Sequence, residues 1–119
     1  ESLYIKSLLL MEMNDNQRSL KLLEKIISLG CQDASVYNQQ GIALISVNKP
    51  KKALFSFQNA IDLDPTNIVN YKLRSEAFLM IDSLEPAIDS LTETLNIFPD
   101  DLDSKERLLS LSQNFETVT

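Results

Sequence analysis

The stretch KKALFSFQNAIDLDPTN, residues 51–67, decides the fold. Its apolar residues recur every three to four positions, which predicts an amphipathic helix with one buried face. Along that face a small residue, a large one and a second small one come before a proline: Ala53, Phe57, Ala60 and Pro65. A proline disfavours helical geometry at the residue before it. The stretch therefore indicates a helix with sites of close approach, followed by a turn.

The same order of residues returns 34 residues later, in EPAIDSLTETLNIFPDD. A shift by this period places like residues on each other: Tyr37 on Tyr71, Ala53 on Ala87 and Pro65 on Pro99. Residues of the types that cap helix N-termini keep the period too, each ahead of a helical pattern: Asp33, Asn67 and Asp101. A further set suits tight turns between apolar runs: Asn14, Asn48 and Asp82. Core and capping positions that share one period predict a repeat array.

Each period holds two helical patterns, which are too short to bury their apolar face alone and must stack. We predict an all-α fold, a right-handed α-solenoid of three helix-turn-helix units with a C-terminal capping helix. The units cover about residues 1–33, 34–67 and 68–101 of a single domain, followed by a capping helix at about 102–114 and a frayed tail at 115–119. The six helices of the units are expected at about 2–13, 17–29, 34–47, 49–63, 68–81 and 83–97.

Charge and hydropathy limit the partners. The net charge of −6 repels nucleic acid, and no apolar run is long enough to suggest membrane insertion. Between Arg74 and Lys105 the sequence holds eight acidic residues and no basic one. We expect that stretch to be a solvated outer face or to meet a basic partner.

The sequence lacks the residue sets that catalysis usually needs. It has no His, one Cys and two Gly, which excludes Cys/His metal sets, Ser-His-Asp or Cys-His nucleophiles and a Gly-rich phosphate loop. Glu85, Asp89 and Glu93 lie four residues apart, and we interpret this row as an exposed helix face. We therefore expect no enzyme activity, no metal and no cofactor.

The lone Cys31 excludes an internal disulfide and favours a cytoplasmic location. The chain begins at Glu1 with no Met, which indicates a fragment of a longer protein. For this reason the absence of a targeting signal says little about the whole protein.

The repeating positions resemble those of the tetratricopeptide repeat family, over about residues 2–114. The middle unit carries the pattern as Tyr37, Gly41, Leu44, Ala53, Phe57, Ala60 and Pro65. The third carries it as Tyr71, Ser75, Phe78, Ala87, Leu91, Thr94 and Pro99, with Thr94 in place of the second alanine. The first is degenerate, with Leu3, Ser7, Leu10, Ser19, Leu23, Ile26 and Cys31 at these places.

The resemblance implies a protein-interaction module in which the first helix of each unit lines a concave groove. The expected groove residues are those that the core does not use: Tyr4, Ile5, Leu8, Met11, Asn38, Gln39, Ile42, Ile45, Lys72, Leu73, Glu76, Leu79 and Met80. Because this face is mostly apolar, we expect it to bind an apolar or basic peptide or helix of a partner protein by burial. The alternative is a self-association or structural module that uses the same face to dimerise or to pack on the parent chain.

Chaperone-binding members of the family hold the C-terminal carboxylate of Hsp70 or Hsp90 in a clamp of Lys, Asn and Arg side chains. The matching positions here are Tyr4, Leu8, Gln39, Val69 and Leu73, none of which is a cation. Registers that begin at Asn38 or at Lys72 fail as well. We therefore expect no Hsp70/Hsp90 carboxylate clamp.

Overall fold

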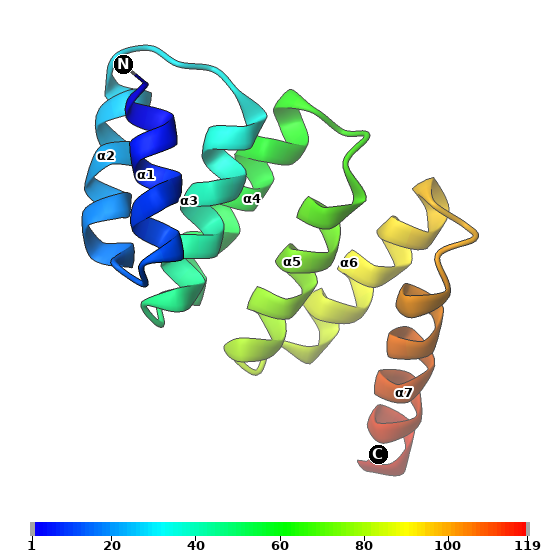
Figure 1. Cartoon of the computed structure of the whole chain (residues 1–119). Helices are drawn as coiled ribbons and strands as arrows, with labels where there is room; N and C mark the ends of the chain where they lie inside the picture. The colour runs from blue at the N-terminus through cyan, green and yellow to red at the C-terminus, as the bar shows by residue number, and fades with distance from the viewer. Residues whose placement is uncertain (1, 119) are drawn as a thin grey trace.

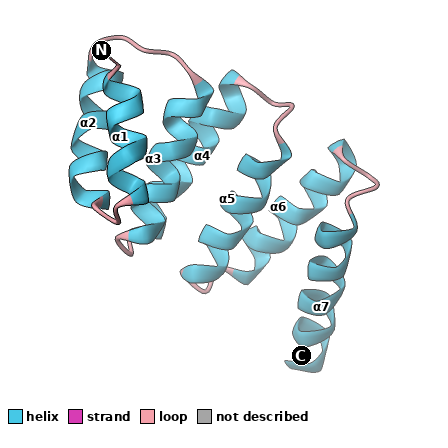
Figure 2. Cartoon of the chain, viewed as in Figure 1, coloured by secondary structure: helices cyan, strands magenta, loops and turns pink. Residues whose placement is uncertain are grey.

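A computed structural model of the chain describes the backbone of residues 2–118 and the side chains of residues 2–113. Within these residues the chain forms seven helices and no strand, which confirms the all-α prediction (Figure 2). Their bounds are α1 Leu3–Glu12, α2 Asn16–Ser28, α3 Ala34–Ser46, α4 Pro50–Leu63, α5 Ile68–Met80, α6 Leu84–Ile97 and α7 Leu102–Val118. The first six helices begin and end within one residue of the predicted bounds.

The helices stack in chain order into an elongated α-solenoid, with the two termini at opposite ends (Figure 1). The radius of gyration is 15.4 Å, whereas a compact domain of this length would have about 13.5 Å. Each helix packs on the next one along the chain. In addition α1 contacts α3, and α3 contacts α5, while no pair among α2, α4 and α6 makes comparable contact in the described residues. The first helices of the pairs therefore lie on the inner side of the curve.

The polar residues with the 34-residue period hold the helix ends as predicted. The three capping side chains each accept a hydrogen bond from a backbone N–H two or three residues further on, at 2.9–3.0 Å: Asp33, Asn67 and Asp101. The turn residues all adopt the left-handed conformation, with φ values of 63°, 62° and 57°: Asn14, Asn48 and Asp82. This conformation is costly for most side chains and tolerated by Asn and Asp. The turn within each pair is therefore built in the same way three times.

The last helix is longer than predicted. We expected it to end near residue 114, with a frayed tail at 115–119, but α7 continues to Val118. The prediction was wrong because no Gly or Pro between residues 102 and 118 stops the helix. Thr119, the last residue of the predicted tail, lies outside the described residues.

Two helices approach closely where Gly41 of α3 faces Phe57 of α4. A Cβ atom on Gly41 would lie 2.5 Å from Cε1 of Phe57, whose side chain is fully buried. No carbon atom fits at that distance, so the large ring requires the missing side chain. The equivalent positions pair Ser7 with Leu23 and Ser75 with Leu91. A larger residue on the first helix thus goes with a smaller one on the second.

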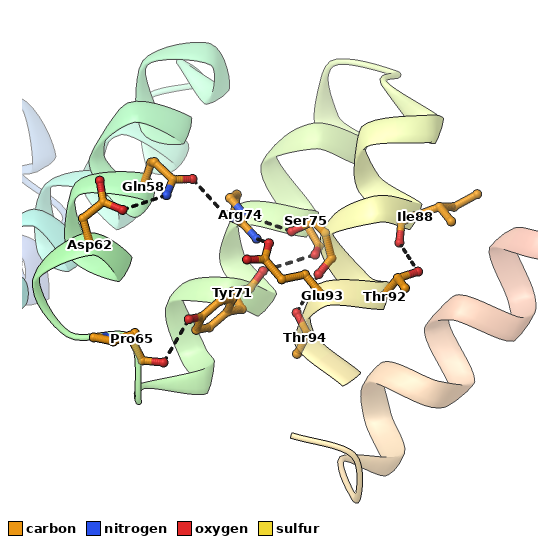
Figure 3. Close-up of polar contacts among 11 residues, drawn as sticks. Gln58, Asp62, Pro65, Tyr71, Arg74, Ser75, Ile88, Thr92, Glu93 and Thr94 are labelled. Carbon is orange, nitrogen blue, oxygen red and sulfur yellow. Dashed lines mark hydrogen bonds and ion pairs between the residues drawn. The ribbon is translucent and has the colours of Figure 1, made fainter. Parts of the chain in front are cut away.

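The joint between the second and third helix pairs is centred on a buried arginine, Arg74 of α5 (Figure 3). Its guanidinium donates to the side chains of Gln58 on α4 and Ser90 on α6, at 2.8 and 2.9 Å. It also pairs with Glu93, whose side chain is 52% exposed. The charge is therefore satisfied at the rim of the core, and three helices are held together by one side chain.

Tyr71 supports the same joint from within the core. Its ring lies edge-on to Phe98, with 5.6 Å between the ring centres. Its hydroxyl donates to the carbonyl oxygen of Pro65 at 2.9 Å, as Figure 3 shows. An aromatic residue that recurs with the repeat thus fixes the chain reversal before its own helix.

The size match between Gly41 and Phe57 leads to a test. Gly41→Ala is expected to lower the free energy of unfolding by about 1–2 kcal/mol, because overpacking outweighs the better helix propensity of alanine. In a Phe57→Leu background the same substitution should be near neutral or stabilising. Chemical denaturation of the four proteins gives the coupling between the two sites. An equal loss in both backgrounds would contradict the proposed steric cause.

Candidate functional site

The predicted groove residues lie on the first helices, α1, α3 and α5, and remain accessible. None of the thirteen is fully buried. Ile5 and Met80 are exposed, at 53% and 44% of their surface, and the others are partly buried. The face is therefore not sealed into the core, and an apolar strip follows the inner side of the stack.

Part of this strip is already packed against the core. Four of the apolar groove residues cover the buried cluster around Leu44 and Phe57: Met11, Ile42, Ile45 and Leu73. Tyr4 packs against a second cluster, which includes Leu23 and Val36. These five side chains form the floor of the strip. The apolar residues outside both clusters lie towards its two ends: Ile5, Leu8, Leu79 and Met80.

Three polar members of the face, Asn38, Lys72 and Glu76, are engaged within the protein. Asn38 donates from its side-chain amide to Asn70 across the α3–α5 contact, at 2.6 Å. Lys72 lies 3.1 Å from a carboxylate oxygen of Asp101 and 3.3 Å from one of Asp103. Lys72 is therefore already paired, and so is the other charged residue predicted for the groove, Glu76, which pairs with Arg107.

The capping helix contributes to this end of the face, which the sequence analysis missed. Arg107 of α7 pairs with Glu76 at 2.7 Å. The repeat period held a signal for this contact, because Arg107 follows Leu73 by 34 residues and so occupies a groove position on a further first helix. The helix after Asp101 therefore continues the inner face as well as capping the stack.

The start of α7 is held by a shared carboxylate. Ser104 donates to Asp101 from its hydroxyl, at 2.6 Å, and from its backbone N–H. The hydrogen bond from Ser104, followed by the contact with Lys72, lowers the pKa of Asp101. On the other side the hydrogen bond to Asp101 raises the pKa of Lys72. Both charges thus stabilise the docked position of α7.

The well-formed hollows of the described chain lie mostly away from the predicted groove. One of about 410 Å³ lies between α2 and α4, and another of about 430 Å³ lies between α4 and α5. A third, near the start of the chain, is lined by one groove residue, Tyr4. The inner face is therefore a shallow strip, which suits an extended segment or a helix better than a small molecule.

The described residues show little sign of other chemistry. No three metal-ligating side chains come together among them. None of the helices in that part of the chain has both the length and the apolar character needed to cross a bilayer. In the acidic row on α6, Glu93 is used by the arginine joint, while Glu85 and Asp89 are exposed.

Comparison with known proteins agrees with this architecture. Residues 34–67 match the family model of the tetratricopeptide repeat. This match makes the middle helix pair a tetratricopeptide repeat, and the whole stack has the fold of solved tetratricopeptide repeat domains. Proteins with tetratricopeptide repeats mediate protein–protein interaction.

Among known tetratricopeptide repeat relatives, the chain is 32% identical over 74 residues to the protein STIP1 homolog of Dictyostelium discoideum. The match covers 62% of this chain and 13% of that protein, so the chain spans a small part of the relative.

Solved structures show the same fold at low identity. MamA has a TM-score of 0.88 at 18% identity, over 96% of this chain and 67% of that one. The first repeat domain of Spaghetti (RPAP3), bound to the HSP90 peptide SRMEEVD, has a TM-score of 0.84 at 17% identity, over 96% and 90%. The second domain of human RPAP3, in complex with an HSP70 peptide, has 0.83 at 16%, over 93% and 92%.

The pairing of Asp101 predicts a response to acid. A carboxyl whose pKa is lowered by folding stabilises the fold above its unfolded pKa of about 4, and this contribution is lost as the pH falls through the folded pKa. Asp101→Asn retains an N-cap but neither titrates nor pairs with Lys72. Thermal unfolding followed by circular dichroism should show a smaller drop in Tm between neutral and acid pH for the variant. An unchanged drop would mean that Asp101 contributes nothing to acid sensitivity.

Proposed function

We propose that this chain is a binding module whose inner face holds a helix or extended segment of a partner protein. The observation that carries the proposal is the accessible apolar strip along α1, α3 and α5, with exposed Ile5 and Met80 at its two ends. A contiguous apolar surface on a soluble helical stack is a usual sign of a partner. Solenoids use such inner faces for extended ligands. The peptides bound by the RPAP3 domains support peptide binding as the mode.

The proposed recognition rests on burial of apolar side chains rather than on a carboxylate clamp. The positions that match the clamp of chaperone-binding members hold no cation: Tyr4, Leu8, Gln39, Val69 and Leu73. The cation on the face, Lys72, is occupied by Asp101 and Asp103. A net charge of −6 also repels an acidic tail at this face. The proposed partner is therefore an apolar or basic segment, with no role for an Hsp70 or Hsp90 C-terminus.

Two substitutions test this face. Leu8→Asp and Leu79→Asp place a charge at the two ends of the strip, outside the packed clusters. Each should weaken partner binding by about tenfold or more, since a buried leucine is worth about 1.5–3 kcal/mol. Quantitative affinity capture from a native extract measures the retained partners. Ile97→Asp, on α6 and 44% exposed, is the control for a new acid elsewhere.

The outcome depends on the variants remaining folded, which circular dichroism checks. Unchanged helicity with loss of the same partners from both groove variants supports the proposal. If Leu79→Asp unfolds the chain, the face belongs to the core. Retention of every partner by both folded variants would show that the strip is not the binding surface.

Self-association is a second candidate, favoured by the side of α1 on which no described helix packs. Leu9 is 54% exposed, whereas the equivalent residues Ala43 and Ala77 are fully buried. Met13, four residues after Leu9, is also exposed. The face that is covered in the second and third helix pairs is therefore open in the first. We infer that a second copy of this chain covers it.

A dilution series followed by light scattering distinguishes self-association from binding of a different protein. Self-association through α1 predicts a mass that falls from dimer to monomer on dilution, and Leu9→Lys should shift this transition to higher concentration by at least about tenfold. Leu79→Asp, at the far end of the strip, should leave it in place. If the unsubstituted chain and Leu9→Lys are both monomeric at all concentrations, self-association of the isolated chain is excluded.

A further inference from the structure

The cations of this acidic protein are segregated along the chain. Seven of the eleven Lys and Arg residues come before residue 60. In the later part Lys72, Arg74 and Arg107 each pair with a carboxylate. Five exposed lysines on α2 and at the start of α4, by contrast, form no ion pair with any described acid: Lys21, Lys25, Lys49, Lys51 and Lys52. A concentrated, unneutralised positive charge therefore remains on the outer, second-helix side of the stack.

Three of these lysines line a hollow with an apolar base. The hollow between α2 and α4, of about 410 Å³, is lined by Lys21, Lys49 and Lys52 together with Leu20 and Leu44. Only one acidic residue, Glu24, also lines it. Lysines at the rim of an apolar surface attract carboxylates while their stems extend the apolar contact.

Phe55 joins this hollow to a second one. Its side chain is 74% exposed and lines both the hollow between α2 and α4 and that between α4 and α5. The second hollow, of about 430 Å³, is formed mainly by Leu54, Phe78 and Ile81, with Lys51 at its edge. An exposed aromatic residue between two hollows is the arrangement typical of an anchor at an interface.

We propose that the two hollows and Phe55, here called the α4 surface, bind an acidic, amphipathic segment of another protein. An apolar side chain of the segment fills the hollow at Phe78 and Ile81, and its carboxylates pair with Lys49, Lys51 and Lys52. Charge complementarity selects this occupant, because Lys49, Lys51 and Lys52 form no ion pair with an acid among the described residues. A nucleic acid fits less well, since the net charge of −6 repels a polyanion and the second hollow is apolar.

This surface is separate from the inner face. The α4 surface is built mainly on second helices and takes an acidic segment, whereas the inner face is built on first helices and is proposed to take an apolar or basic one. The two proposals can therefore fail independently. Substitutions at Leu8 and Leu79 test the inner face alone, and substitutions at the lysines test the α4 surface alone.

The test begins with selection of short random peptides displayed against the immobilised chain. Enrichment of sequences that combine several carboxylates with an apolar residue is expected. The affinity of one synthetic peptide from that pool is then measured by fluorescence anisotropy. Lys51→Glu combined with Lys52→Glu should weaken binding by at least about tenfold, and Phe55→Ala should weaken it similarly. Binding to the unsubstituted protein should also weaken as ionic strength rises.

Lys105→Glu is the matched control, because Lys105 is an exposed lysine on α7 without an ion pair to a described acid. It should leave the peptide affinity unchanged within about twofold. Enrichment of neutral or basic sequences would overturn the proposal, as would equal losses from Lys105→Glu and the double variant. A single-stranded oligonucleotide that binds more tightly than the peptide at the same lysines would assign the surface to nucleic acid instead. If the molecular mass in solution increases without peptide, and the lysine substitutions prevent this increase, the surface binds a second copy of the chain instead.

Discussion

The structure depends on one constraint, which is that a pair of short helices cannot bury its apolar face without a neighbour. Close approach within each pair solves half of this problem. Gly41 admits the ring of Phe57, and Ala53 and Ala60 are fully buried between helices. Stacking solves the other half, because the first helices α3 and α5 also pack on the preceding pair. A curved array with an accessible inner face follows from these two contacts, and so does the residue period that reveals it.

The two joints of the array use different chemistry. Between the first and second pairs, Leu20 of α2 packs into the apolar cluster of α3 and α4. Between the second and third pairs, Arg74 is buried and hydrogen-bonded to helices on both sides of it. A buried cation is stable only where its partners are placed correctly, so this joint favours one register of the stack at a cost in solvation. The apolar joint is more tolerant of small shifts. Order along the array is therefore fixed most firmly near its middle.

Local rules made most of the fold predictable, whereas contacts between repeats did not follow from them. The caps at Asp33 and Asn67 and the left-handed turn at Asn48 depend on a few adjacent residues, and the sequence contains all of that information. The inner face could be predicted as a set of positions, because the period assigns each residue to a side of its helix. The engagement of Lys72 by Asp101 and the burial of Arg74 were missed, since both depend on how one pair is placed on the next. The exposed fraction of each residue along the strip likewise could not be predicted from the sequence.

The charge distribution has a physical reason within this architecture. Helices packed on both sides leave little room for charges, so most acids and cations lie on the outer edges of the stack. Among the described residues, acids of the later repeats pair with Lys72, Arg74 and Arg107, whereas the lysines of α2 and α4 form no ion pair. Stacked repeats contact only their neighbours, so such a difference between the two ends does not disturb the fold. A solenoid can therefore carry an apolar strip on its inner side and a positive surface on its outer side without conflict. The two surfaces proposed for this chain are a consequence of that freedom, and they would allow one short domain to hold two partners of opposite character.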